Sequence, residues 1–136
     1  MKTVLFACVH NAGRSQMAAA FFNDLADPTV ARAVSAGTEP GDHVHPEVVT
    51  AMREAGFDVS RAVPRRLTTE LAQSADLLVT MGCGEACPYV PGLRTEDWPL
   101  DDPKGRGAEE VRRIRDQVRE RVQALVTREG WSRPLA

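Results

Sequence analysis

The residues best suited to chemistry in this chain lie between Cys8 and Ser15, where five residues separate a cysteine from an Arg-Ser pair. An apolar run precedes this stretch and an amphipathic segment follows it, so it is predicted to be a loop between a strand and a helix. The first turn of a helix has unpaired backbone N–H groups and partial positive charge, and both attract anions. Arg14 adds a planar guanidinium that suits two oxygens of a tetrahedral oxyanion.

Cys8 is the expected nucleophile of this loop. Positive surroundings favour the thiolate form of a cysteine, and the Ser15 hydroxyl can donate a hydrogen bond to the sulfur. A cysteine at the end of an apolar strand is often only a packing residue, but its combination with Arg14, Ser15 and Gly13 favours catalysis. Gly13 is predicted to supply φ freedom to a tightly curled backbone. The residues predicted to bind the oxyanion are Val9, His10, Asn11, Ala12, Gly13, Arg14 and Ser15.

Two further groups of residues could take part in chemistry. Asp101 and Asp102 precede Pro103, and this segment is predicted to be a loop because proline disfavours helix before it; a simple turn is the alternative. Cys83 and Cys87 lie four residues apart in a Gly-containing segment, where their sulfurs could reach disulfide distance. A redox pair is favoured over half of a zinc site or a chance pairing, since the chain has only three histidines. No resident metal is expected.

Composition indicates one ordinary globular domain over residues 1–136. The chain has 43% hydrophobic and 26% charged residues, and its net charge of −2 provides no basic excess for nucleic acid or an acidic membrane. No apolar run approaches the roughly 18 residues of a membrane span, and the apolar start is too short for a secretory signal. Three cysteines, an odd number, argue against structural disulfides. We expect a cytoplasmic monomer.

Apolar runs and amphipathic segments alternate along the chain. Strands are expected at 3–7, 30–35, 75–81 and 94–98, and helices at 17–25, 46–55, 69–72 and 108–129. This pattern predicts an α/β domain whose parallel sheet has helices on both faces. The loops that carry Cys8, Cys83 and Asp102 would then meet at one edge of the sheet. His43 and His45, in a polar loop before a helix, are expected to be solvated.

The sequence resembles the low-molecular-weight protein tyrosine phosphatase-like family, and especially its arsenate reductase branch. Four blocks in the family's order carry the resemblance: the Cys8 to Ser15 loop with Gln16-Met17-Ala18 after it, Ser35-Ala36-Gly37, Thr80-Met81-Gly82-Cys83, and Trp98-Pro99-Leu100-Asp101-Asp102-Pro103. The resemblance implies that family's fold, a four-stranded parallel sheet in the order 2-1-3-4.

The resemblance also implies a reaction. Cys8 attacks arsenate, Arg14 and the loop amides hold its oxygens, and Asp102, directly before the proline, is the general acid. Cys83 then attacks the Cys8 sulfur as arsenite leaves, and Cys87 attacks Cys83 to give a disulfide that thioredoxin reduces. No cofactor is bound. The catalytic residues implied in this way are Cys8, Arg14, Ser15, Asp102, Cys83 and Cys87.

Three alternatives remain. Cys83 and Cys87 are closer together than the last two cysteines of thioredoxin-linked members, and the stretch Gly82-Cys83-Gly84-Glu85-Ala86-Cys87-Pro88 also resembles members that use a small thiol such as mycothiol with a glutaredoxin-like partner. A phosphatase for phosphotyrosine would use the same loop and Asp102, but Lys104 and Gly105 follow where that group usually has aromatic residues. A non-enzymatic oxyanion or redox sensor would leave Asp102 without a role.

Overall fold

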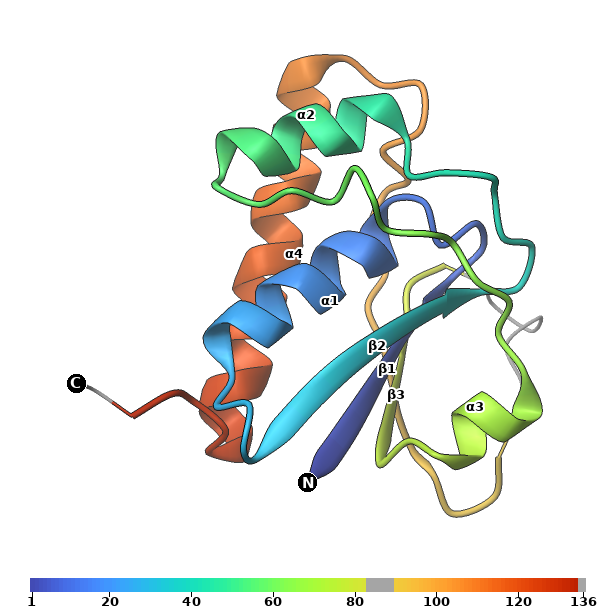
Figure 1. The fold of residues 1–136 in the computed structure, drawn as a ribbon, viewed down its shortest axis with the longest axis vertical. Helices are drawn as coiled ribbons and strands as arrows, with labels where there is room; N and C mark the ends of the chain where they lie inside the picture. Colours follow the sequence, from blue (N-terminus) through green and yellow to red (C-terminus); the bar gives the residue numbers. More distant parts are fainter. Residues whose placement is uncertain (83–89, 135–136) are drawn as a thin grey trace.

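Four strands and four helices make up the part of the chain that the computed structural model describes, residues 1–82 and 90–134 (Figure 1). The strands are β1 (Lys2–Cys8), β2 (Ala31–Gly37), β3 (Leu77–Thr80) and β4 (Arg94–Asp97). The helices are α1 (Arg14–Leu25), α2 (Pro46–Glu54), α3 (Thr69–Gln73) and α4 (Ala108–Glu129). The α/β organisation predicted from the sequence is confirmed, and each expected strand and helix is present.

The four strands form one parallel sheet in the order β2-β1-β3-β4, as the family resemblance implied. Cys8 at the end of β1 is paired with Gly37 at the end of β2. Thr80 at the end of β3 is paired with Ala7 of β1 and with Asp97 at the end of β4. The carboxyl ends of all four strands therefore lie at one edge of the sheet, which is where ligands bind in open α/β folds. The segments that carry the predicted nucleophile and the predicted general acid both start there.

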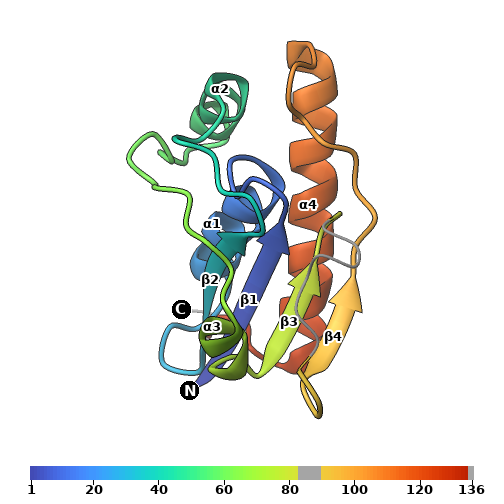
Figure 2. The ribbon, with the colours of Figure 1, turned by 90° about the vertical axis from the view of Figure 1, so that its right-hand side faces the viewer.

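Helices cover both faces of the sheet, but unequally (Figures 1 and 2). On one face, Val4 and Phe6 of β1 belong to the main hydrophobic core, together with apolar residues of α1, α2 and α4. On the other face, Leu5 and Ala7 pack with Ala72 of the short helix α3 in a smaller cluster. Because β1 is buried on both faces, its sequence is a continuous apolar run instead of an alternating pattern.

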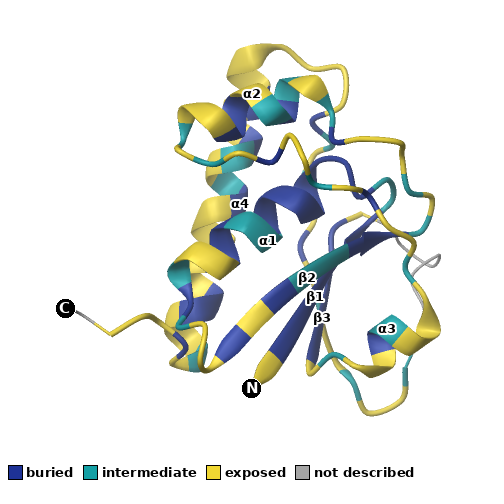
Figure 3. Cartoon of the chain, in the orientation of Figure 1, coloured by how far each residue is buried: buried dark blue, intermediate teal, exposed yellow. Residues whose placement is uncertain are grey.

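The long helix α4 packs one apolar stripe against this core and exposes its opposite face (Figure 3). The stripe consists of Val111, Ile114, Val118, Val122 and Leu125. Gly130 ends the helix in a left-handed conformation with φ 73°, and Trp131 then docks with its ring centroid 6.0 Å from that of Phe22. Neither α4 nor another helix in the described part of the chain is long and apolar enough to cross a membrane.

Helix α1 begins at Arg14, earlier than the predicted start at residue 17. Its first turn, Arg14-Ser15-Gln16, is polar and yet buried, so no hydrophobic period marks it in the sequence. Only residues 9–13 connect β1 to α1. The connection is therefore a short loop whose last residue adjoins the amino end of a helix.

Candidate active site

The loop at residues 9–13 is held from outside by the segment that follows β2. The amides of Glu39, Gly41 and His45 donate to the carbonyl oxygens of Val9, His10 and Ala12 at 2.8, 2.9 and 2.9 Å. In a planar trans peptide the N–H points away from the C=O, so outward carbonyls turn the next amides toward the inside of the loop. Together with the amino end of α1, these inward amides form a surface suited to an anion.

A chain of hydrogen bonds leads from the buried side of this loop to the sulfur of Cys8. The side-chain amide of Asn11 donates to Ser15 Oγ at 2.7 Å, and Ser15 Oγ lies 2.9 Å from Cys8 Sγ. Because Ser15 Oγ accepts from Asn11, its own proton is available for the sulfur, and such a bond stabilises a thiolate. Asn11 is itself fixed by Oδ1, which accepts from the Arg65 amide at 3.0 Å and from Gln16 Nε2 at 3.2 Å.

Arg14 connects this loop to the ends of two other strands. Its Nη1 donates to the Leu100 carbonyl at 2.9 Å, and its Nη2 lies 3.8 Å from Asp102 Oδ2. A Cβ on Gly82, just after β3, would lie only 2.5 Å from Nη1, so the absence of a side chain there makes room for the guanidinium. The Arg14 side chain is 9% exposed. Neither Leu100 nor Gly82 was predicted to contact Arg14.

The two aspartates after β4 differ in what they contact. Asp102 Oδ1 accepts from the Lys104 amide at 3.0 Å, and its carbonyl accepts from Arg106 Nε at 2.8 Å, while the Asp102 side chain remains 45% exposed. Asp101 Oδ2 lies 3.2 Å from Arg113 Nη2 on α4. Asp102 is thus directed to the loop, and Asp101 is engaged by α4.

These parts enclose a small pocket with a volume of about 10 Å³ over the Cys8 loop. It is lined by Cys8, His10, Ala12, Gly13, Arg14, His45 and Asp102. The pocket combines a sulfur, a guanidinium and a carboxylate, which suits attack on an oxyanion with a proton donor nearby.

His45 was expected to be solvated, but the structure places it in this pocket. Burial lowers the pKa of His45 below its ordinary 6.5, although the nearby carboxylates of Glu47 and Asp102 act in the opposite direction. The folded protein therefore favours the neutral imidazole. Pro46 was the available signal in the sequence, since it begins α2 and makes His45 the residue that joins the helix to the loop.

The chain was next compared with known proteins. A family model described as low molecular weight phosphotyrosine protein phosphatase matches residues 3–130. The chain belongs to this family.

Relatives within the family have names that refer to arsenate. A Halobacterium salinarum protein named, provisionally, arsenate reductase is 45% identical over 86% of this chain and 85% of its own length. A glutaredoxin arsenate reductase from Synechocystis is 37% identical over 94% of this chain and 98% of its own length. The structure of a thioredoxin-dependent arsenate reductase from Corynebacterium glutamicum has a TM-score of 0.81 and 36% identity, and covers 94% of this chain. This chain spans 61% of that protein's length.

The low molecular weight phosphatase loop in this chain differs from the expectation in one respect. Gly13 has φ −144° and ψ −95°, outside the α and β regions, and so it does not carry the positive φ of this loop. The residue with positive φ is Asn11, at 51°. What Gly13 provides is space, because a Cβ at this position would lie 2.9 Å from Cγ of Pro103. Val9, Asn11 and Ser15, also predicted to bind the oxyanion, are not among the residues that line the pocket as described. Cys83 and Cys87 lie outside the described residues, so their pairing stays a prediction.

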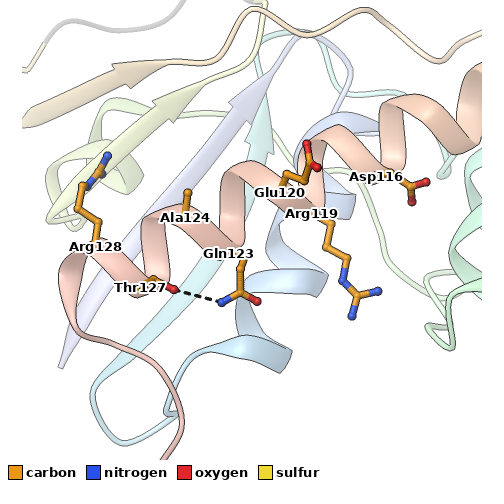
Figure 4. Close-up of a pocket in the computed structure, with 7 residues that line it drawn as sticks. All are labelled: Asp116, Arg119, Glu120, Gln123, Ala124, Thr127 and Arg128. Atoms are coloured by element: carbon orange, nitrogen blue, oxygen red, sulfur yellow. Dashed lines mark hydrogen bonds between the residues drawn. The ribbon is translucent and has the colours of Figure 1, made fainter.

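A second and larger cavity, about 730 Å³, lies along the exposed face of α4 (Figure 4). All its lining residues come from this one helix: Asp116, Arg119, Glu120, Gln123, Ala124, Thr127 and Arg128. Gln123 Nε2 donates to Thr127 Oγ1 at 3.2 Å. None of these residues lines the Cys8 pocket.

Proposed function

We propose that this protein reduces arsenate to arsenite, with Cys8 as the nucleophile. The observation that carries the proposal is the small pocket, where Cys8, Arg14 and Asp102 come together from three segments of the chain. The names of the relatives favour arsenate over other oxyanions. We place the reaction in the cytoplasm, where thiols are kept reduced.

The first step forms a covalent adduct on Cys8. The Cys8 thiolate attacks arsenic, held by the loop amides and by Arg14, and one As–O bond breaks. Asp102 gives its proton to the departing hydroxide, which leaves as water. Arsenic remains As(V) and is bonded to the Cys8 sulfur. The 2.9 Å contact of Ser15 with the sulfur stabilises the thiolate before this attack.

The reduction step uses the other two cysteines. The Cys83 thiolate attacks the Cys8 sulfur, the S–As bond breaks, and its electron pair stays with arsenic, which leaves as arsenite, As(III). Cys87 then attacks Cys83, which frees Cys8 and leaves a Cys83–Cys87 disulfide. Two thiols have lost two electrons and arsenate has gained them. Support for this relay comes from the spacing of the cysteines in the sequence and from the family resemblance.

Thioredoxin is the reductant that we propose for the disulfide. One structural relative is named for thioredoxin and one sequence relative for glutaredoxin, so the family draws on more than one source of thiols. The alternative for this chain is a small thiol such as mycothiol with a glutaredoxin-like protein. In that case the small thiol, in place of Cys83, attacks the Cys8 sulfur.

A second candidate function is hydrolysis of phosphate monoesters. It is favoured by the family itself, because the same nucleophile and acid serve a phosphocysteine intermediate. Cys83 and Cys87 would then have no role. We rank it below arsenate reduction for this reason.

The deciding experiment is a single turnover of the fully reduced protein with arsenate and no added reductant. We expect one equivalent of arsenite per protein and, by mass spectrometry of the thiols, a disulfide between Cys83 and Cys87. Arsenite that forms only with a small thiol and a glutaredoxin-like protein would support the alternative donor. No arsenite under either condition, together with hydrolysis of p-nitrophenyl phosphate, would replace the proposal by the phosphatase function.

Two variants assign the steps. Cys8→Ser should abolish arsenite formation and arsenate attachment together, and residual turnover would show that another residue is the nucleophile. Cys83→Ser should still attach arsenate to Cys8 but should form no arsenite. If Cys83→Ser behaves as the wild type does, the relay is wrong even though the first step stands.

A further inference from the structure

We propose that His45 is a specificity-determining residue, whose side chain walls the Cys8 pocket so that a free oxyanion enters and an aryl phosphate is excluded. The inference rests on the proposed function and adds to it the reason why the substrate is the inorganic anion. It stands on the position of His45 in the pocket and on the way its backbone is fixed.

The backbone of His45 is attached both to the loop and to α2. Its amide donates to the Ala12 carbonyl of the loop at 2.9 Å. Its own carbonyl accepts from the amides of Val48 and Val49 in the first turn of α2, both at 3.0 Å. Val44 beside it is 3% exposed and anchors the chain from the other side. The backbone that carries the imidazole is therefore fixed beside the pocket and is not the end of a loose loop.

Asp102 also lines the pocket, and Pro103 follows it in the chain. Pro103 is buried against Gly13, and the Gly13 position is also close to the imidazole, since a Cβ there would lie 3.7 Å from His45 Cδ2. His45 and Pro103 thus both lie close to Gly13 of the loop. The enclosed volume of about 10 Å³ is roughly one water molecule, so any substrate must displace part of the wall.

Asp102 and His45 differ in how easily they can move. The Asp102 side chain is 45% exposed and is bonded to the amide of Lys104 in its own loop, whereas the backbone that carries the His45 imidazole is hydrogen-bonded to both the Cys8 loop and α2. A compact tetrahedral anion can enter if only the Asp102 side chain moves. An aryl ester also needs a passage for its ring, and on the α2 side the imidazole blocks that passage.

The groups around His45 favour its neutral form. Burial lowers the pKa of His45, Lys104 and His10 act in the same direction, and together they outweigh the carboxylates of Glu47 and Asp102, which raise it. A neutral imidazole makes no ion pair with Asp102, so the carboxyl group stays available to the leaving oxygen. Size, and not charge, is then what His45 contributes.

The test compares wild type, His45→Ala, His45→Phe and the control His43→Ala with two substrates. His43 is an exposed histidine of the same segment and does not line the pocket. The substrates are arsenate, with arsenite measured in a single turnover, and p-nitrophenyl phosphate. In the second, Cys8 attacks phosphorus, nitrophenol leaves with a proton from Asp102, and water hydrolyses the phosphocysteine.

We expect His45→Ala to raise kcat/KM for p-nitrophenyl phosphate about tenfold relative to wild type, the effect of a modest change in pocket size. The ratio of this activity to arsenite formation should rise relative to the His43→Ala control, which should keep both wild-type activities. His45→Phe, which keeps a ring at this position, should still exclude the aryl phosphate. Circular dichroism of each variant verifies that α2 remains folded.

Three results overturn the inference. Equal ratios of the two activities in His45→Ala and His43→Ala would show that His45 excludes nothing. Loss of arsenite formation in His45→Ala would make the imidazole part of the arsenate reaction instead of a wall. A gain of aryl phosphate activity in His45→Phe would mean that its chemistry, not its size, matters. If wild type forms no arsenite at all, the proposed function fails, whatever the ratios are.

Discussion

The two sides of the Cys8 pocket are built by opposite physical means. On the nucleophile side, Asn11 and Ser15 are fully buried, uncharged and joined by short hydrogen bonds within one stretch of sequence. On the acid side, Asp102 is half exposed, and its neighbour Asp101 is paired with Arg113, itself 44% exposed, from a distant helix. A buried hydrogen bond that loses one partner costs far more than an exposed ion pair that breaks. The sulfur is therefore fixed, while the acid can yield to a substrate.

The largest effect is expected for Asn11→Ala, which removes buried hydrogen bonds on the nucleophile side of the pocket. This change leaves the Arg65 amide and Ser15 Oγ without a buried partner and puts alanine at positive φ, so unfolding should become easier by about 2 kcal/mol. Because Ser15 then no longer directs its proton to Cys8, single-turnover arsenite formation should fall on the order of 100-fold. Urea unfolding and rapid quench measure the two effects.

Asn23→Ala is the matched control for this change. Asn23 also uses its side chain on backbone, donating to the Ala33 carbonyl and accepting from the Ala33 amide, but it is far from the pocket. It should lose stability and keep the rate of arsenite formation. If the rate in Asn11→Ala matches that in Asn23→Ala, the buried hydrogen bonds hold the fold and do not serve the sulfur.

On the acid side of the pocket, Asp102→Asn should lower the activity and leave the free energy of unfolding almost unchanged. Asparagine cannot give a proton to the departing oxygen, so adduct formation should slow about 100-fold. The free energy of unfolding should change by less than about 0.5 kcal/mol, since the side chain is half exposed. Asp101→Asn, which removes only the contact with Arg113, should leave the adduct rate near wild type. A large loss of stability in Asp102→Asn would contradict the proposed difference between the nucleophile side and the acid side of the pocket.

A smaller effect is expected where the two sides meet, at Gly82. Alanine there would place its Cβ 2.5 Å from Arg14 Nη1 and force the guanidinium to move, so phosphate should bind about tenfold more weakly. Gly92→Ala is the control, because Gly92 also has positive φ, at 83°, but no described atom lies within 4 Å of its Cβ position. Both variants should lose about 1 kcal/mol of stability from the backbone. Isothermal titration with phosphate separates them, and equal affinities would show that Gly82 does not position Arg14.

The same contrast explains which parts of the site could be predicted from the sequence. The Cys8 loop is one continuous stretch between a strand and a helix, so its residue types and spacing indicated an anion site before the fold was known. The period of α4 likewise predicted bounds, 108–129, that match the structure. Both depend on neighbours in the sequence.

Contacts between distant residues gave no such signal. Leu100 contributes a carbonyl to Arg14, and a backbone group has no signature in the sequence. His45 lines the pocket because its amide, just before α2, donates to the Ala12 carbonyl of the loop. Only the folded chain makes this contact. The positive φ of the loop likewise could not be assigned from the sequence: glycine is the usual choice for positive φ, but here hydrogen bonds to its side chain hold Asn11 in that conformation.

The smallest effect is expected for His45, and it is measured in the pH dependence of the free energy of unfolding. Burial lowers the pKa of His45 in the folded protein, while the unfolded chain takes up a proton near the ordinary 6.5. As pH falls below 6.5, the unfolded state therefore binds the proton first, and stability present above that pH is progressively lost. His45→Gln should flatten the decline in urea midpoint between pH 7 and pH 5, whereas His43→Gln, an exposed control, should keep the wild-type slope. An unchanged slope in His45→Gln would mean that the imidazole is as well solvated as in the unfolded chain and does not close the pocket.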